Sequence, residues 1–81
     1  MTDEIFSKHY KKLVEILRDN DTVNTHHLQR VLRIGYYKAL KIYKYLKNKK
    51  IISGEKIKVT PFGKVKVGII DEDRLKETLY N

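Results

Sequence analysis

The chain has 81 residues and no cysteine, and its 18 Lys and Arg against 10 Asp and Glu give a net charge of +8. This length fits one domain over residues 1–81, the missing cysteines exclude disulfides and thiolate metal sites, and no apolar run approaches the ~18 residues of a membrane-spanning helix. Residues 26–66 hold twelve basic residues and one acidic residue, Glu55, for a net charge of +11, whereas the stretches before and after carry −1 and −2. Such confinement favours a polyanionic partner over an evenly lysine-rich surface.

Residues 3–19 have the apolar spacing of an amphipathic helix, with Leu13, Ile16 and Leu17 on its apolar side. Residues 21–23 are then expected to form a linker or a very short strand. The helix has a basic and polar outer side, so its apolar side is expected to pack on the rest of the domain.

A second helix is predicted from about Thr25 to Leu32, with Asn24 or Thr25 as its N-cap. Gly35 then supplies the permissive backbone that a tight turn between two helices needs. A third helix is predicted over residues 36–48.

The third predicted helix divides into an apolar arc and an outer arc. The apolar arc includes Tyr36 and Tyr43, whose rings are expected in the core with the hydroxyls at its rim. The outer arc contains no acidic residue, and its candidate contact residues are Tyr37, Lys38, Lys41, Lys44 and Tyr45. A solvated lysine face is the alternative interpretation, but it does not explain why acids are missing directly after the turn.

The apolar period changes to two after residue 54, which predicts two strands joined by residues 61–63. A three-residue hairpin loop needs a left-handed residue at its end, and Gly63 suits that place. The resulting register pairs Val59 with Val65. All the lysines of the hairpin are then expected on one face, either to contact phosphates or to protect an edge strand: Lys56, Lys58, Lys64 and Lys66.

A short last helix is predicted over residues 71–80, with Asp71 as its N-cap. The order helix, helix, tight turn, helix, hairpin predicts an α+β winged helix-turn-helix with three helices, a two-stranded β-hairpin wing and a short C-terminal helix. In helix-turn-helix proteins the helix after the turn enters the major groove of DNA. We therefore expect double-stranded DNA as the partner, with recognition helix 36–48 in the major groove and wing 56–67 on the backbone.

Several residues of the middle stretch resemble a known family: Leu28-Gln29-Arg30, Arg33-Ile34-Gly35-Tyr36, Ala39, Ile42, Leu46 and Ile51-Ile52. They resemble the C-terminal gamma domain of the FtsK/SpoIIIE DNA translocases. The resemblance implies a winged helix that binds double-stranded DNA, with core roles for Ile34, Gly35, Tyr36, Ala39, Ile42 and Leu46. It also implies DNA-facing roles for Tyr37, Lys38 and Lys41, where the family usually has other polar residues, so its preferred DNA sequence does not carry over. The motor activity of the translocases does not carry over either. A chain of this size is also similar to small winged-helix regulators of archaea and their viruses.

The remaining candidate DNA contacts lie outside the third helix. His26 begins the second helix, and Arg30 and Arg33 precede the turn. The wing contributes Lys58, Lys64 and Lys66. The three histidines have no carboxylate partner at a metal-site spacing, so neither a metal nor another cofactor is expected.

The leading interpretation is a sequence-specific DNA-binding transcriptional regulator in the cytoplasm, associated with the nucleoid or, for a viral protein, in the host cytoplasm. A homodimer is expected, because the terminal helices carry more apolar surface than a three-helix core covers. Two alternatives stay open: a winged-helix protein-interaction module, and a non-specific architectural nucleic-acid binder. No catalytic grouping of residues is present, so no enzymatic activity is expected.

Overall fold

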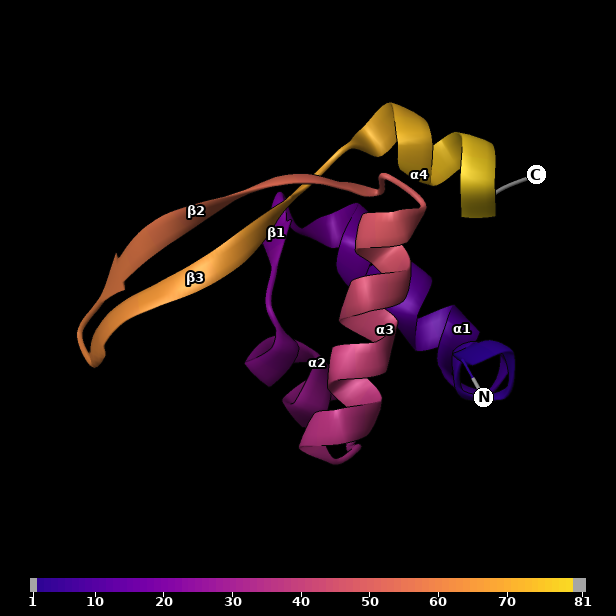
Figure 1. Ribbon diagram of the computed structural model, residues 1–81, viewed down its shortest axis with the longest axis horizontal. Helices are drawn as coiled ribbons and strands as arrows, with labels where there is room; N and C mark the ends of the chain where they lie inside the picture. The colour runs from indigo at the N-terminus through magenta and orange to yellow at the C-terminus, as the bar shows by residue number, and fades with distance from the viewer. Residues whose placement is uncertain (1, 80–81) are drawn as a thin grey trace.

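Four helices and three strands make up the computed structural model, which describes residues 2–79 and the side chains of residues 8–78. In chain order the elements are α1 (Thr2–Asp19), β1 (Thr22–Val23), α2 (Thr25–Leu32), α3 (Tyr36–Asn48), β2 (Ile52–Thr60), β3 (Gly63–Ile70) and α4 (Glu72–Leu79). The hairpin of β2 and β3 projects away from the bundle of α1, α2 and α3, and α4 lies at the other end of these strands (Figure 1). The predicted α+β winged helix is confirmed, while Tyr80, the predicted end of the last helix, lies outside the described residues.

The turn between α2 and α3 differs from the prediction at Gly35. Asn24 caps the start of α2, where its side-chain Oδ1 accepts a hydrogen bond of 2.6 Å from the His27 N–H. At the other end Arg33 adopts the left-handed conformation (φ 53°, ψ 52°) and donates its N–H to the Gln29 carbonyl. Gly35 is extended (φ −73°, ψ 169°), as any residue can be. Arg33 therefore carries the cost of the turn, about 1–2 kcal/mol for a residue with a side chain.

The wing hairpin has a two-residue loop, not the predicted loop of three residues. Thr60 pairs with Gly63, and its hydroxyl closes the loop by donating to the Gly63 carbonyl at 2.7 Å and accepting from the Phe62 N–H at 3.2 Å. Gly63 has the positive φ that was expected, at +125°. The Thr60 hydroxyl thus satisfies polar groups of the two-residue loop. Relative to the predicted pairing, the two strands are shifted by one residue.

This shift redistributes the wing lysines between two faces, since directly opposed residues of a pair project on the same side. Lys58 pairs with Val65, whereas Lys64 pairs with Val59. Lys66 lies across from Ile57. The expectation that all the wing lysines share one face was therefore wrong.

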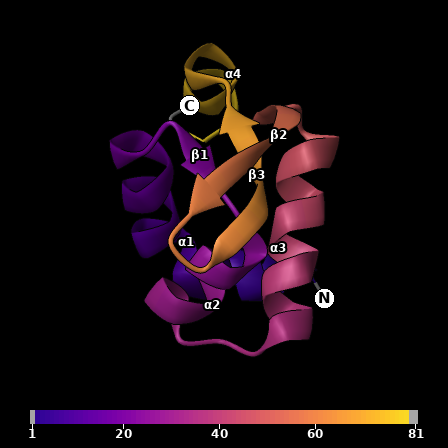
Figure 2. The ribbon, with the colours of Figure 1, turned by 90° about the vertical axis from the view of Figure 1, so that its left-hand side faces the viewer.

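A third strand joins the wing to the helices. Thr22 of β1 pairs with Ile69 of β3, which gives an antiparallel sheet in the order β1-β3-β2. The short segment after α1 is therefore a strand rather than a linker, and the sheet has three strands where the sequence predicted two. This pairing ties the base of the wing to β1, and Figure 2 shows the hairpin in front of β1 with its loop near α2.

The core lies between the first three helices, the base of the wing and α4. Its most deeply buried side chains are Leu13, Leu17, Val23, Leu28, Ala39, Ile42, Leu46, Ile51 and Leu75. Ile34 packs against this core and Tyr43 is buried, but Tyr36 is 51% exposed, which corrects the core role expected for it. Among residues 2–79, no helix combines the length and apolarity needed to cross a membrane.

The apolar stripes of the terminal helices are used inside the chain. Leu13, Ile16 and Leu17 of α1 are buried, as is Leu75 of α4. On α1, Tyr10 and Val14 keep partial exposure. The expectation that these helices leave a large uncovered apolar surface was therefore wrong for the described side chains.

Candidate nucleic-acid interface

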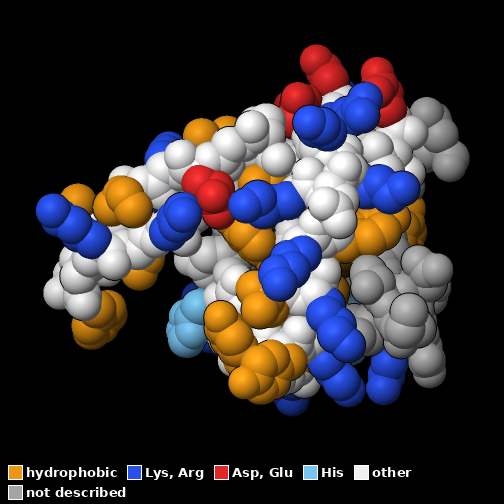
Figure 3. All heavy atoms as spheres, in the orientation of Figure 1, with side chains coloured by type: hydrophobic (Ala, Val, Ile, Leu, Met, Phe, Trp, Pro, Cys, Tyr) orange, Lys and Arg blue, Asp and Glu red, His pale blue; other side chains and the backbone are white. Residues whose placement is uncertain are grey.

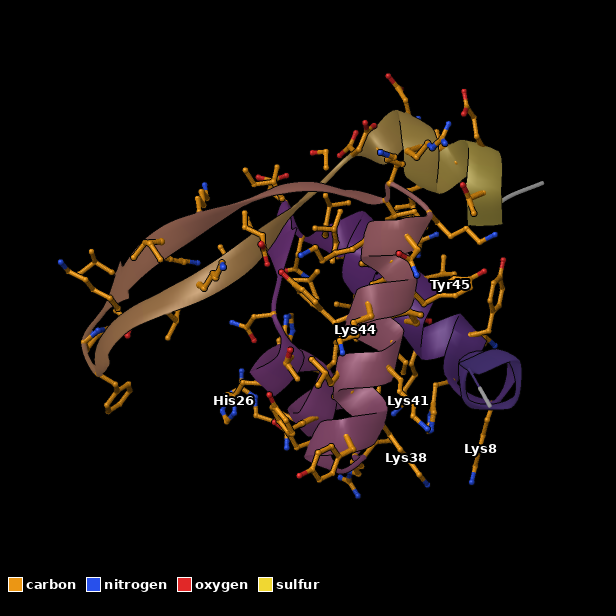
Figure 4. The ribbon with its side chains drawn as sticks, viewed as in Figure 1. Lys8, His26, Lys38, Lys41, Lys44 and Tyr45 are labelled. Atoms are coloured by element: carbon orange, nitrogen blue, oxygen red, sulfur yellow. The ribbon has the colours of Figure 1, made fainter. Side chains whose placement is uncertain are left out.

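The outer face of α3 carries the largest group of predicted site residues. Lys38, Lys41 and Lys44 are exposed and project from successive turns of the helix (Figure 4). All three lie outside the arc on which Ala39, Ile42 and Leu46 pack, with Lys44 opposite that arc and Lys38 at its edge, so the burial of one arc holds the other in solvent. Lys and Arg side chains gather along this face, while most acidic side chains in view lie over α4 (Figure 3).

Two tyrosines stand at the first turn of α3. Tyr37 is 78% exposed, and its ring meets that of Tyr36 edge to face with centroids 5.5 Å apart. An edge-to-face pair holds both rings against each other. The tip of α3 therefore presents two exposed aromatic side chains beside Lys38 and Lys41.

Tyr45 is less exposed than the three lysines. It lies four residues after Lys41 and so on the same side of α3. Its ring packs against the core, and the Lys49 Nζ lies 5.7 Å from its ring centroid. Figure 4 shows Tyr45 on the α1 side of α3, away from His26. A DNA contact by Tyr45 stays a prediction.

Three further predicted residues line the side of α2. Arg30 and Arg33 are exposed, and His26 is exposed at the first turn. His26 projects toward the side on which the wing extends (Figure 4). The structure thus places His26 and Arg30 next to the wing, whereas Arg33 lies in the turn that precedes α3.

A groove of about 230 Å³ separates α2 from one face of the wing. Its α2 wall consists of His26, His27 and Arg30, and its wing wall includes Lys58 and Val65. No acidic residue is among the described side chains that line it. Burial, followed by the nearby Arg30 charge, lowers the pKa of His27 below its ordinary value.

The opposite face of the wing is tied to α3 through Glu55. Its carboxylate accepts a hydrogen bond of 2.7 Å from the Tyr43 hydroxyl. It also lies 3.5 Å from the Lys47 Nζ and 3.6 Å from the Lys66 Nζ. Lys66, predicted to contact DNA, is therefore ion-paired within the protein.

Sequence reasoning counted Glu55 only as the single acid of the basic stretch. The hydrogen bond from Tyr43, and then the charges of Lys47 and Lys66, lower the pKa of Glu55. Burial, together with the hydrogen bond to Glu55, raises the pKa of Tyr43. One acid among twelve cations is the signal in the sequence that could have indicated this structural role.

Replacing Glu55 with Gln is expected to lower the melting temperature more at pH 7 than at pH 3. Because the pKa of Glu55 is lower in the folded protein than its ordinary value of 4.5, ionised Glu55 stabilises the fold above that pH, and this contribution is lost as the pH falls through the folded pKa. Thermal melts of both proteins from pH 7 to pH 3 check this. A difference in melting temperature that stays constant over the range would contradict it.

A protein-family model, described as the Ftsk gamma domain, matches residues 4–59 of the chain. The matched part contains α3 and all but the last residue of β2, whereas β3 and α4 follow it. Comparison with the curated proteins gave no match, and neither did comparison with the solved structures.

Proposed function

The chain belongs to the FtsK gamma domain family of winged-helix DNA-binding domains, and from this premise we propose that it is a sequence-specific binder of double-stranded DNA that regulates transcription in the cytoplasm. In this proposal α3 lies in the major groove and the wing lies against the DNA backbone. The protein acts by binding, with no catalytic step of its own.

The observation that carries the proposal is the acid-free outer face of α3. Lys38, Lys41 and Lys44 project from a helix whose other side is locked into the core, so their positions relative to a duplex are set before binding. The major groove admits one α-helix, and a lysine there can reach the O6 and N7 acceptors of guanine. Tyr36 and Tyr37 add exposed rings at the end of the same helix.

Non-specific binding is the second candidate, because the same lysines bind phosphates without reading bases. An electrophoretic titration with duplexes selected from a random pool, against unselected duplexes of equal length at two salt concentrations, separates the two. Sequence-specific binding is expected to favour the selected duplexes by at least about a thousandfold. Equal affinity for both sets would leave the architectural role, and no affinity for either would leave a protein-interaction module.

We retain the homodimer as part of the proposal, on narrower support than the sequence suggested. The support is the partly exposed pair Tyr10 and Val14 on α1, which together with Arg18 border a shallow hollow. A C2 dimer places two recognition helices about one DNA turn apart, ~34 Å. Sedimentation is expected to give a dimer on DNA, and a monomer at high micromolar concentration, both with and without DNA, would refute it.

A further inference from the structure

The groove between α2 and the wing has the chemistry of an anion site. Arg30 from α2 and Lys58 from β2 face it from opposite walls, and both side chains are exposed. The floor includes Val23 of β1, which is buried and joins the two walls. Because one water takes up about 30 Å³ in the liquid, a groove of about 230 Å³ has room for a phosphodiester group with several waters.

The corrected hairpin register decides which wing lysine faces this groove. Lys58 lines it with Thr60 and Val65, whereas Lys64 projects from the other side of the same hairpin. Lys66 also projects from that other side and is ion-paired with Glu55. Of the three wing lysines predicted to bind DNA, Lys58 is the one on the groove.

We propose that this groove holds the phosphodiester backbone of one DNA strand, clamped between Arg30 on α2 and Lys58 on the wing. The inference rests on the proposed function and adds the path of the backbone. With α3 in the major groove of the DNA, the DNA strand at the edge of that major groove runs past α2. The wing lies on the other side of this DNA strand. His26 and His27 line the same wall and donate ring N–H groups to phosphate oxygens.

The test compares two lysines that differ in face but not in charge. Lys58→Ala, Arg30→Ala and Lys64→Ala are titrated in the full chain against a fluorescein-labelled 20-base-pair duplex of random sequence, because phosphate contacts are independent of sequence. Lys58→Ala and Arg30→Ala are each expected to weaken binding about five- to tenfold at 0.1 M salt and to reduce the slope of log affinity against log salt by about 0.9. Lys64→Ala is expected to reduce both quantities less than either of these variants, because Lys64 does not line the groove.

Protonation of His27 supplies a second readout. The groups that face His27 in the groove are Arg30, Lys58 and His26, all of them basic. A phosphate placed among them raises the pKa of His27, so binding takes up a proton and affinity increases as the pH falls through the raised pKa. Between pH 7.5 and 5.5 the gain is expected to shrink in His27→Gln and to persist in His9→Gln, which changes a histidine of α1, and one linked proton gives at most about tenfold per pH unit.

The outcomes separate the groove from the function. If the unmodified protein binds the duplex but Lys58→Ala and Arg30→Ala bind as well as it does, the groove proposal is overturned and DNA binding through α3 stands. Equal losses in Lys58→Ala and Lys64→Ala also overturn it, since both faces of the wing would then contribute. No binding by the unmodified protein to random or selected duplexes overturns both proposals.

Discussion

Reversing the charge of Lys41 and Lys44 to Glu is expected to lower DNA affinity by about two orders of magnitude at 0.1 M salt without unfolding the protein. Two lost phosphate contacts reduce the slope of log affinity against log salt by about 1.8, and the two new carboxylates add repulsion. Both side chains are exposed, and the core residues of α3 lie on its other side, so the melting temperature is expected to change little. Anisotropy titrations over a series of salt concentrations, with a thermal melt of each protein, measure both effects.

The matched control is the double variant Lys8→Glu, Lys12→Glu. It changes the net charge by the same amount on α1, where both lysines are exposed (Lys8 is labelled in Figure 4). If attraction by net charge alone governs binding, the two double variants weaken it equally, and the assignment of α3 as the recognition helix is refuted. A located surface predicts a loss at least tenfold larger for the variant on α3. Where Lys41 or Lys44 contacts a base, its replacement also reduces the discrimination between DNA sequences, by about 1–3 kcal/mol for each good contact.

The order of elements was predictable from the sequence because each helix has its own spacing of buried residues. The arc of α3 that holds Ala39, Ile42 and Leu46 is apolar, and its burial in the structure follows directly from that pattern. Tyr36 was misplaced because a helical wheel gives the angle of each side chain but does not say where neighbouring helices begin and end. Tyr36 projects at the end of α3 and is 51% exposed. Tyr45 is partly buried against the core, which a wheel of α3 alone does not show.

The wing register was predicted wrongly, because matching apolar residues with apolar residues across the hairpin favours an alignment that the structure does not adopt. Pairing Val59 with Val65 matches like with like, but the structure pairs Val59 with Lys64. Few polar groups fix the observed register. The Thr60 hydroxyl bonds both the Gly63 carbonyl and the Phe62 N–H, and a pattern of apolar residues does not reveal these hydrogen bonds. The register also changes the candidate site, because it places Lys64 and Lys66 on the face of the wing away from the groove that Lys58 lines.

The contact between the wing and α3 through Glu55 and Tyr43 was likewise not predictable from the sequence. Glu55 and Tyr43 are twelve residues apart and belong to elements whose angle the sequence does not specify. Their hydrogen bond, with Lys47 and Lys66 at the same carboxylate, sets where the wing stands relative to the recognition helix. What a single sequence offers is the oddity of one acid in a basic stretch, which calls for a partner without naming it.

Gly68 lies at the same contact between the wing and α3, next to the Tyr43 hydroxyl. We expect Gly68→Ala to destabilise the protein by about 1–3 kcal/mol. An added Cβ would lie 2.8 Å from the Ile52 Cγ2 and 2.9 Å from the Tyr43 hydroxyl oxygen. Ile52 is 4% exposed, and Tyr43 is held by its 2.7 Å hydrogen bond to Glu55, so neither side chain moves aside without losing its own contacts. For a domain of this size each kcal/mol lowers the melting temperature by about 4–8 °C.

Gly54→Ala is the control for this substitution, because Gly54 lies on the neighbouring strand β2 and a Cβ there meets no atom within 4 Å. Thermal melts of the two variants are expected to differ by at least about 4 °C, with Gly54→Ala close to the unmodified protein. If the two melts coincide, Tyr43 moves aside at no cost, and its contact with Glu55 then does not hold the wing against α3. If they differ as expected, Gly68→Ala is also expected to make the protein less sensitive to Glu55→Gln, because a Tyr43 displaced by the new Cβ no longer donates to the carboxylate.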